Sequence, residues 1–272
     1  MSKQSTQWLI PLGLAVAATA ALGYYWFQVS RPEPVAPPQP TQPLVSSEPE
    51  VVPGPLHPVA TMETERAERP ELVPLPALDQ SDEYFKLGLS DVFGDAIGTM
   101  LVESGMIEKV VATVDNLPRQ QVAEKIRPIG KLPEQFKVES QDDNNNTYTI
   151  SAENYARYDP MVNLVVAADT QEMVALYRRF YPLFQSAYQD LGYPGGYFND
   201  RLVEVIDHLL TSPQPQEPVT LVQPHVLFEY ADESLESLSS GQIMLLRMGN
   251  DNAEEMKSVL RRLRTLVTDL EQ

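Results

Sequence analysis

The sequence predicts a mainly α-helical globular domain with a small β-hairpin, joined by a disordered, proline-rich linker to a single N-terminal transmembrane helix. Three observations predict this class. Residues 8–27 are uncharged, 13 of the 24 prolines fall within 32–76, and apolar residues after that recur mainly at helical spacing. The predicted divisions are a tail and anchor over 1–31, a linker over 32–74, and an acidic domain over 75–272.

Residues 8–27 have the length and the ends of a membrane-spanning helix. At about 1.5 Å per residue they span roughly 30 Å, the thickness of a hydrocarbon core. Trp8 at one end and the aromatic residues 24–27 at the other suit the two headgroup layers. A cleaved signal peptide is the alternative, because Ala18-Thr19-Ala20 resembles a cleavage site. The aromatic cluster favours an uncleaved, single-pass membrane anchor.

The orientation of the anchor and the state of the linker follow from local composition. The positive charges on the two sides are nearly balanced, with Lys3 before the stretch and Arg31 after it. A short tail before a long polar remainder favours a domain outside the cytoplasm. Prolines lack N–H donors, so residues 31–40 should adopt extended polyproline II. The linker is interpreted as a passive spacer, and a proline ligand for an aromatic groove is the alternative.

The domain is acidic and contains no cysteine. From Leu72 onward, 16 Lys and Arg face 31 Asp and Glu, which leaves a net charge of −15. Such a surface repels phosphates, so no nucleic-acid partner is expected. The absence of cysteine from the sequence excludes disulfides, thiol catalysis and cysteine-based metal sites. No cofactor is predicted.

The elements of the domain are predicted from spacing and capping residues. Asp79 or Ser81 begins the first helix, Asp169 with Glu172 has capping-box spacing, and Gly192 ends that helix. Asp159-Pro160 reads as an N-cap followed by proline. A helical pattern is predicted over about 82–103, broken by Gly88, Gly94 and Gly98. Further helices are predicted over about 107–117, 120–127, 160–168, 171–191, 199–211, 233–247 and 252–270.

One β-hairpin is predicted around a turn tract. Phe136 and Val138 alternate with polar residues, as do Tyr148 and Ile150, and residues 142–146 between them are Asp and Asn. Ser151 is expected to cap a short helix. A further short strand is predicted around 226–230.

Several sequence blocks occur in the order found in a known bacterial family. They are Leu-Pro-Ala-Leu-Asp-Gln-Ser-Asp at 75–82, Arg-Phe-Tyr-Pro-Leu-Phe-Gln at 179–185, Gly-Tyr-Pro-Gly-Gly-Tyr-Phe-Asn-Asp-Arg-Leu at 192–202, and segments 223–232 and 245–253. Over about 75–270 the chain resembles the family catalogued as domain of unknown function 3014. The resemblance implies an envelope protein of Gram-negative bacteria, so the anchor is expected in the inner membrane and the domain in the periplasm. It supplies no activity, substrate or catalytic residue.

The search for chemistry yields no catalytic residue and no metal site. The sequence holds no His-Glu-x-x-His pair, nucleophile elbow or phosphate loop. Asp200, Glu204 and His208 stack at ligand-like spacing, but the apolar residues of that helix lie opposite, so the row is interpreted as a solvated polar stripe. A basic stripe, Lys257, Arg261 and Arg264, is expected to meet the domain's own acidic surface; an anionic partner is the alternative.

The turn 193–201 follows the densest aromatic region and is the predicted recognition patch. Its members are Tyr193, Gly195, Gly196, Tyr197, Asn199, Asp200 and Arg201. The alternative is a packed corner in which Asp200 and Arg201 satisfy backbone groups. The leading hypothesis is a non-enzymatic module that contacts an envelope protein or the cell wall. An enzyme acting on envelope glycan or peptide is the alternative, which a buried carboxylate with a raised pKa would favour.

Overall fold

The computed structural model describes residues 54–59, 74–131, 135–142 and 146–270. The chain divides into two units, Met1–Val51 and Val52–Gln272, and the described residues all belong to the second. The predicted anchor over 8–27 and most of the linker lie outside the described residues. Within those ranges, no helix combines the length and the apolar character needed to cross a bilayer.

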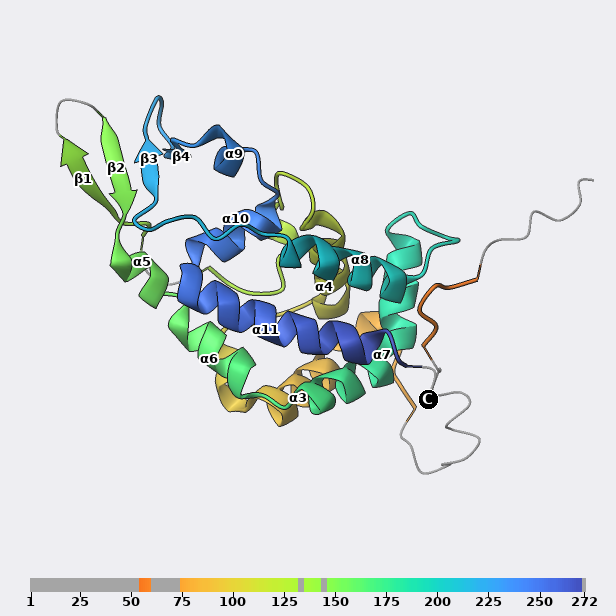
Figure 1. The fold of residues 1–272 in the computed structure, drawn as a ribbon. Coiled ribbons are helices and arrows are strands. Elements are labelled where there is room, and N and C mark those ends of the chain that lie inside the picture. Colours follow the sequence, from red (N-terminus) through yellow and green to blue (C-terminus); the bar gives the residue numbers. More distant parts are fainter. Residues whose placement is uncertain (1–53, 60–73, 132–134, 143–145, 271–272) are drawn as a thin grey trace, which may run out of the picture. The chain divides into compact units, whose positions relative to one another are not determined.

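The described part is mainly helical with a small antiparallel sheet, as predicted (Figure 1). The α-helices are α3 Asp82–Phe93, α4 Met106–Asn116, α5 Ala152–Ala156, α6 Asp159–Ala167, α7 Thr170–Asp190, α8 Phe198–Leu210, α9 Glu233–Glu236, α10 Ser240–Arg247 and α11 Asn250–Val267. Short 3-10 helices are η1 Leu78–Gln80, η2 Asp95–Thr99 and η3 Glu124–Ile126. The strands are β1 Val138–Asp142, β2 Thr147–Ile150, β3 Thr220–Val222 and β4 Glu229–Tyr230.

The sheet is larger than the predicted hairpin. Its order is β1-β2-β3-β4, with every neighbouring pair antiparallel. The hairpin of β1 and β2 is confirmed, whereas β3 was not predicted, because three residues are too few to show alternation. The strand predicted at 226–230 exists only as β4, and Val226 and Leu227 belong to the loop before it.

The core forms around α7 and α11. Phe85, Phe180, Phe184 and Phe198 bring aromatic rings from α3, α7 and α8 together, with centroids 5.1–5.7 Å apart. Helix α11 packs against α6, α7 and α8 (Figure 1). The aromatic residues of α7 at helical spacing are therefore mostly core residues, as predicted.

Several predicted caps are confirmed. Asp169 accepts hydrogen bonds from the N–H groups of Gln171 (2.6 Å) and Glu172 (3.4 Å) and begins α7. Ser151 accepts from the N–H of Glu153 and begins α5. Gly192 ends α7 with φ at 115°, a conformation that favours glycine.

Other predicted boundaries are partly or wholly wrong. Within 82–103 the predicted break at Gly94 is confirmed, because α3 ends at Phe93 and Gly94 turns the chain with φ at 78°. The predicted breaks at Gly88 and Gly98 are wrong, since α3 continues through Gly88 and η2 through Gly98. Only one 3-10 turn lies within 120–127. Helix α6 begins at Asp159 itself, after Tyr158 at the N-cap position, so Asp159 is not the cap.

The helix predicted at 233–247 is divided into α9 and α10. Ser239 forms a capping box with Gln242, which starts a new helix where the prediction had a continuous one.

Candidate functional site

The predicted patch occupies the turn from α7 to α8. Residues 193–197 form the connection, and Asn199, Asp200 and Arg201 lie in the first turn of α8. The structure therefore divides the predicted site into a loop and a helix N-terminus, and the two parts have different surroundings.

The loop packs against α7 and is hydrogen-bonded to it. The Tyr193 ring stacks on Tyr188 with centroids 4.7 Å apart and an interplanar angle of 18°. Gly196 passes so close to Tyr188 that an added Cβ would lie 2.9 Å from its ring. Gln185 of α7 donates to the carbonyl of Gly196 (2.7 Å) and accepts from the N–H of Phe198 (2.9 Å). Gly195 is exposed and Tyr197 is half-buried.

Arg201 points away from solvent and binds Asp115 of α4. Its Nε donates to Asp115 Oδ1 (3.0 Å) and its Nη2 to the Asp115 carbonyl (2.8 Å). The Asp115 carboxylate also accepts from Arg119 (3.0 Å) and from the Tyr193 hydroxyl (3.3 Å). Sequence analysis missed Asp115. Its spacing of four from Arg119 was the available signal, but that spacing is common among surface pairs.

The Asp115 cluster is largely buried. The side chain of Asp115 is 4% exposed and that of Arg201 is 18% exposed. Burial acts to lower the pKa of Arg201, but the hydrogen bond and charge of Glu204 and the charge of Asp115 outweigh it, so the pKa is raised. An ion pair in this setting ties α4 to α8, and breaking it would leave a buried charge without enough partners.

Asn199 and Asp200 bind other segments of the chain. Asn199 is fully buried, accepts from the Tyr177 hydroxyl (3.0 Å) and donates to the carbonyl of Val267 (2.9 Å). Asp200 accepts from the N–H groups of Leu56 (2.9 Å) and His57 (2.7 Å). For Asn199, Asp200 and Arg201 the packed-corner alternative describes the contacts, while recognition by the loop 193–197 stays a prediction.

The polar row on α8 is partly solvent-exposed: Glu204 is exposed, whereas Asp200 and His208 are half-buried. Glu204 pairs with Arg201 (2.8 Å), and His208 Nε2 lies 2.8 Å from the Ser239 hydroxyl. Asp200 is hydrogen-bonded to residues 56 and 57, so each of the three side chains in the row contacts a different part of the chain. In the described ranges, no group of three or more His, Asp or Glu residues is placed to hold a metal ion.

The basic stripe meets acidic side chains of the domain, as predicted. Arg261 pairs with Glu254 (2.8 Å), and Arg264 forms two hydrogen bonds to Asp207. Lys257 differs, because it is buried and donates to the carbonyl of Ser212 (2.6 Å). Burial lowers its pKa.

The carboxyl groups whose pKa values shift are shifted downward. The hydrogen bond from Arg264 lowers the pKa of Asp207, and those from Ser234 lower the pKa of Asp232. Lys131 and Arg261 do the same for Glu124 and Glu254. A general acid needs the opposite direction, so these four groups do not resemble one.

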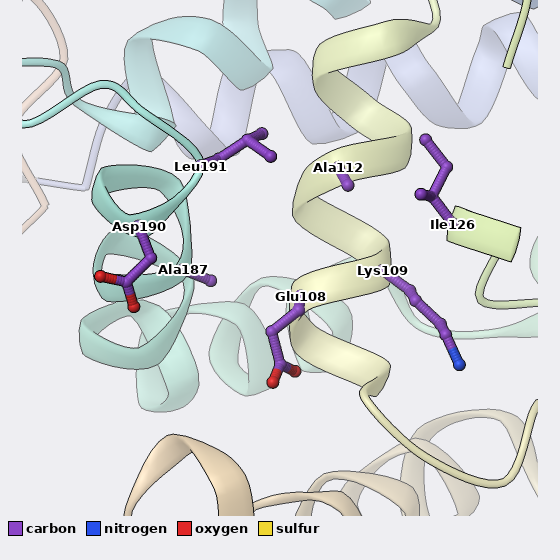
Figure 2. Close-up of a pocket in the computed structure, with 7 residues that line it drawn as sticks. All are labelled: Glu108, Lys109, Ala112, Ile126, Ala187, Asp190 and Leu191. Carbon is purple, nitrogen blue, oxygen red and sulfur yellow. The ribbon is translucent and has the colours of Figure 1, made fainter. Parts of the chain in front are cut away.

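Two hollows lie beside α7. One, of about 280 Å³, lies between α4 and α7, and Figure 2 shows Glu108 and Lys109 extending from α4 with Asp190 on the facing helix. The other, of about 240 Å³, is lined almost wholly by apolar side chains of α3, α7, α8 and α11. Neither contains Asp115 or a residue of the predicted turn.

An exposed apolar surface lies on the sheet. Val226 and Leu227, in the β3–β4 loop, are 86% and 76% exposed, and Phe136 is 39% exposed. Phe228 follows Leu227 in the chain, and its ring lies 6.1 Å from that of Phe136 and 5.1 Å from that of Tyr148. Phe228 and Tyr148 are half-buried and also pack against the core beside the sheet. We call these five residues the sheet-end patch. The sequence suggested a strand here and gave no sign that Val226 and Leu227 would be exposed.

Comparison with known proteins supports the resemblance stated above. Searches of curated proteins and of solved structures found no match. One family matches residues 106–264, which run from the first residue of α4 into α11 and include Asp115, the turn 193–201 and all five patch residues. Because this match covers more than half of the 272 residues, the chain belongs to the family described as "Protein of unknown function (DUF3014)".

Proposed function

We propose that this protein is a membrane-tethered interaction module of the bacterial cell envelope, whose periplasmic domain binds a partner protein through the sheet-end patch. The observation that carries the proposal is the exposure of Val226 and Leu227, adjacent in one loop. Contiguous exposed apolar side chains are costly in water and commonly mark interaction sites. The uncharged stretch over 8–27 and the proline-rich linker supply the tether.

The patch favours a partner with apolar and basic side chains. Glu139 of β1, Glu229 of β4, and Asp232 and Glu233 at the start of α9 lie on the same elements or next to them. Acidic groups near an apolar surface attract basic partners and slow the approach of acidic ones. An apolar contact surface also suits a protein better than the polar glycan of the cell wall.

The binding proposal is tested by photo-crosslinking in intact cells. A photoreactive amino acid replaces Leu227 in one strain and Leu87 in another. Leu87 is a matched control, because it is 66% exposed on α3, away from the sheet. A discrete adduct from position 227 alone, lost when Val226→Asp is added, is expected. Equal adducts from both positions, or none from 227, would contradict the proposed surface.

The topology is tested separately. A reporter active only in the periplasm and another active only in the cytoplasm are each fused after Gln272. The short tail before the uncharged stretch leads us to expect activity from the periplasmic reporter alone. Activity from the cytoplasmic reporter alone would refute the periplasmic location.

A further inference from the structure

Residues 54–59 belong to the predicted linker, yet they are hydrogen-bonded to the domain (Figure 1, orange). Leu56 N–H donates to Asp200 Oδ2 (2.9 Å) and His57 N–H donates to Asp200 Oδ1 (2.7 Å). Asn199 Nδ2 donates to the His57 carbonyl (2.9 Å). Two adjacent side chains of α8 thus bind two consecutive amides and the carbonyl that follows.

The sequence of the segment matches this arrangement. In Pro55-Leu56-His57-Pro58 the prolines lack N–H groups, so Leu56 and His57 carry the only two amide donors, and Asp200 accepts both. The side chain of Leu56 is not used, since that residue is 81% exposed. The hydrogen bonds are therefore all made to main-chain groups of the segment.

The binding groups are positioned by the domain. The other bonds of Asn199, to Tyr177 and to the carbonyl of Val267, fix its amide. Asp200 lies in the first turn of α8, where the helix dipole favours a negative charge. Val59 continues the contact, because it packs against the core clusters that α7 shares with its neighbours.

We propose that Asn199 and Asp200 form a binding site for a bent, proline-flanked peptide, occupied by residues 54–59 of the same chain, and that this clasp sets the reach of the tether. The statement about reach rests on the proposed function. With the clasp closed, residues 32–53 separate anchor and domain, a fully extended length of roughly 70 Å at ~3.1 Å per residue. With it open, residues 32–74 give about 130 Å.

The test measures the distance from the segment to the domain in the full chain in detergent micelles. The chain has no cysteine, so spin labels can be placed at Gly54→Cys, where an added Cβ meets nothing within 4 Å, and at the exposed Glu255→Cys. Double electron–electron resonance then reports the width of the distance distribution. The parent should give a narrow distribution.

Two variants open the clasp from opposite sides. Asp200→Asn replaces one of the two acceptor oxygens with an NH2 donor, and Leu56→Pro removes one donor without changing the domain. Both should broaden the distribution. Their controls are Glu204→Gln, which removes a charge from the same helix, and Leu56→Ala, which keeps the N–H; both should stay narrow. If Asp200→Asn does not fold, Leu56→Pro against Leu56→Ala decides.

Hydrogen exchange gives a second readout. The amides of Leu56 and His57 should lose about ten- to hundredfold protection in Asp200→Asn, the factor expected for bonds to a charged acceptor. A broad distribution in the parent, or equal widths in Leu56→Pro and Leu56→Ala, would overturn the clasp. Because these measurements need neither a partner nor an orientation, the clasp and the proposed function can fail independently.

Discussion

At the scale of single residues, Asp115 is the centre of the α7–α8 corner. Its buried carboxylate accepts from Arg119, which lies just after α4, from Tyr193 of the turn and from Arg201 of α8. A carboxylate removed from water is stable only while such donors remain. The Asp115 carboxylate therefore joins the segments of the corner, and it lines neither of the two hollows beside α7.

The first prediction concerns Arg201→Ala. Loss of the guanidinium leaves Asp115 with fewer donors, and we expect unfolding to become easier by about 2–4 kcal/mol in urea or thermal melts. Glu204→Ala is the control and should cost about 0.5 kcal/mol or less, because it removes only the exposed partner of Arg201. A loss below about 1 kcal/mol for Arg201→Ala would show that the corner does not need the pair.

The sequence could predict which residues of the corner matter but not what they contact. Composition alone singled out Asn199, Asp200 and Arg201. Their partners are distant in the sequence. Asp200 and His57 are 143 residues apart, and Arg201 and Asp115 are 86 residues apart. Such distances are fixed by the tertiary fold, so a single sequence carries no local signal for them.

At the scale of elements, local signals predicted most helices but not the distant cap of α4 or the pairing of β3. Helices α5 and α7 follow their own capping residues. The N-terminus of α4 is instead capped by Asp82 of α3, whose carboxylate accepts from Gly105 and Met106 N–H at 2.8 Å each. Strand β3 is likewise defined by pairing with β2 rather than by its own three residues.

The second prediction tests the cap of α7. Asp169→Ala removes the acceptor of two N–H groups and should cost about 1 kcal/mol in thermal or urea melts. Glu172→Ala is the matched control. The spacing suggests a capping box, but only the hydrogen bonds to the Asp169 side chain are present in the structure. Glu172→Ala should cost about 0.5 kcal/mol or less. Equal losses from the two variants would indicate that the full box forms in solution.

At the scale of the whole molecule, buried tyrosines link stability to alkaline pH. Burial raises the pKa of Tyr155 and of Tyr181 to about 12, and raises that of Tyr177 well above 10.0. The folded state then holds protons that the unfolded chain releases near pH 10.0. Stability from these groups is complete below that pH and falls as pH rises toward 12. Lys257 has the opposite effect: its pKa is lowered in the folded state, so its contribution to stability increases as pH approaches 10.5. The three tyrosines outnumber it, so the net stability should fall.

The third prediction follows from Tyr155, whose buried hydroxyl has no hydrogen-bond partner. Tyr155→Phe removes the unpaired group and one titrating proton, so it should be at least as stable as the parent. Its stability should also decline less steeply between pH 10 and pH 12. Urea melts of both proteins across this range provide the measurement. A variant that is less stable and follows the parent's alkaline decline would show that the hydroxyl is paired in solution.

The last prediction compares two fragments that differ only in residues 54–74. We expect the fragment 75–272 to melt cooperatively, because the change from proline-rich to periodic apolar sequence near Leu75 predicts a domain boundary. The fragment 54–272 should be more stable by about 1–3 kcal/mol, since it restores two amide donors to Asp200, an acceptor to Asn199 and the packing of Val59. Asp200→Asn in both fragments provides the control and should remove most of the difference. A fragment 75–272 without a cooperative transition would place the boundary earlier in the chain, and equal stabilities of the unmodified fragments would mean that residues 54–59 contribute no net stability to the fold.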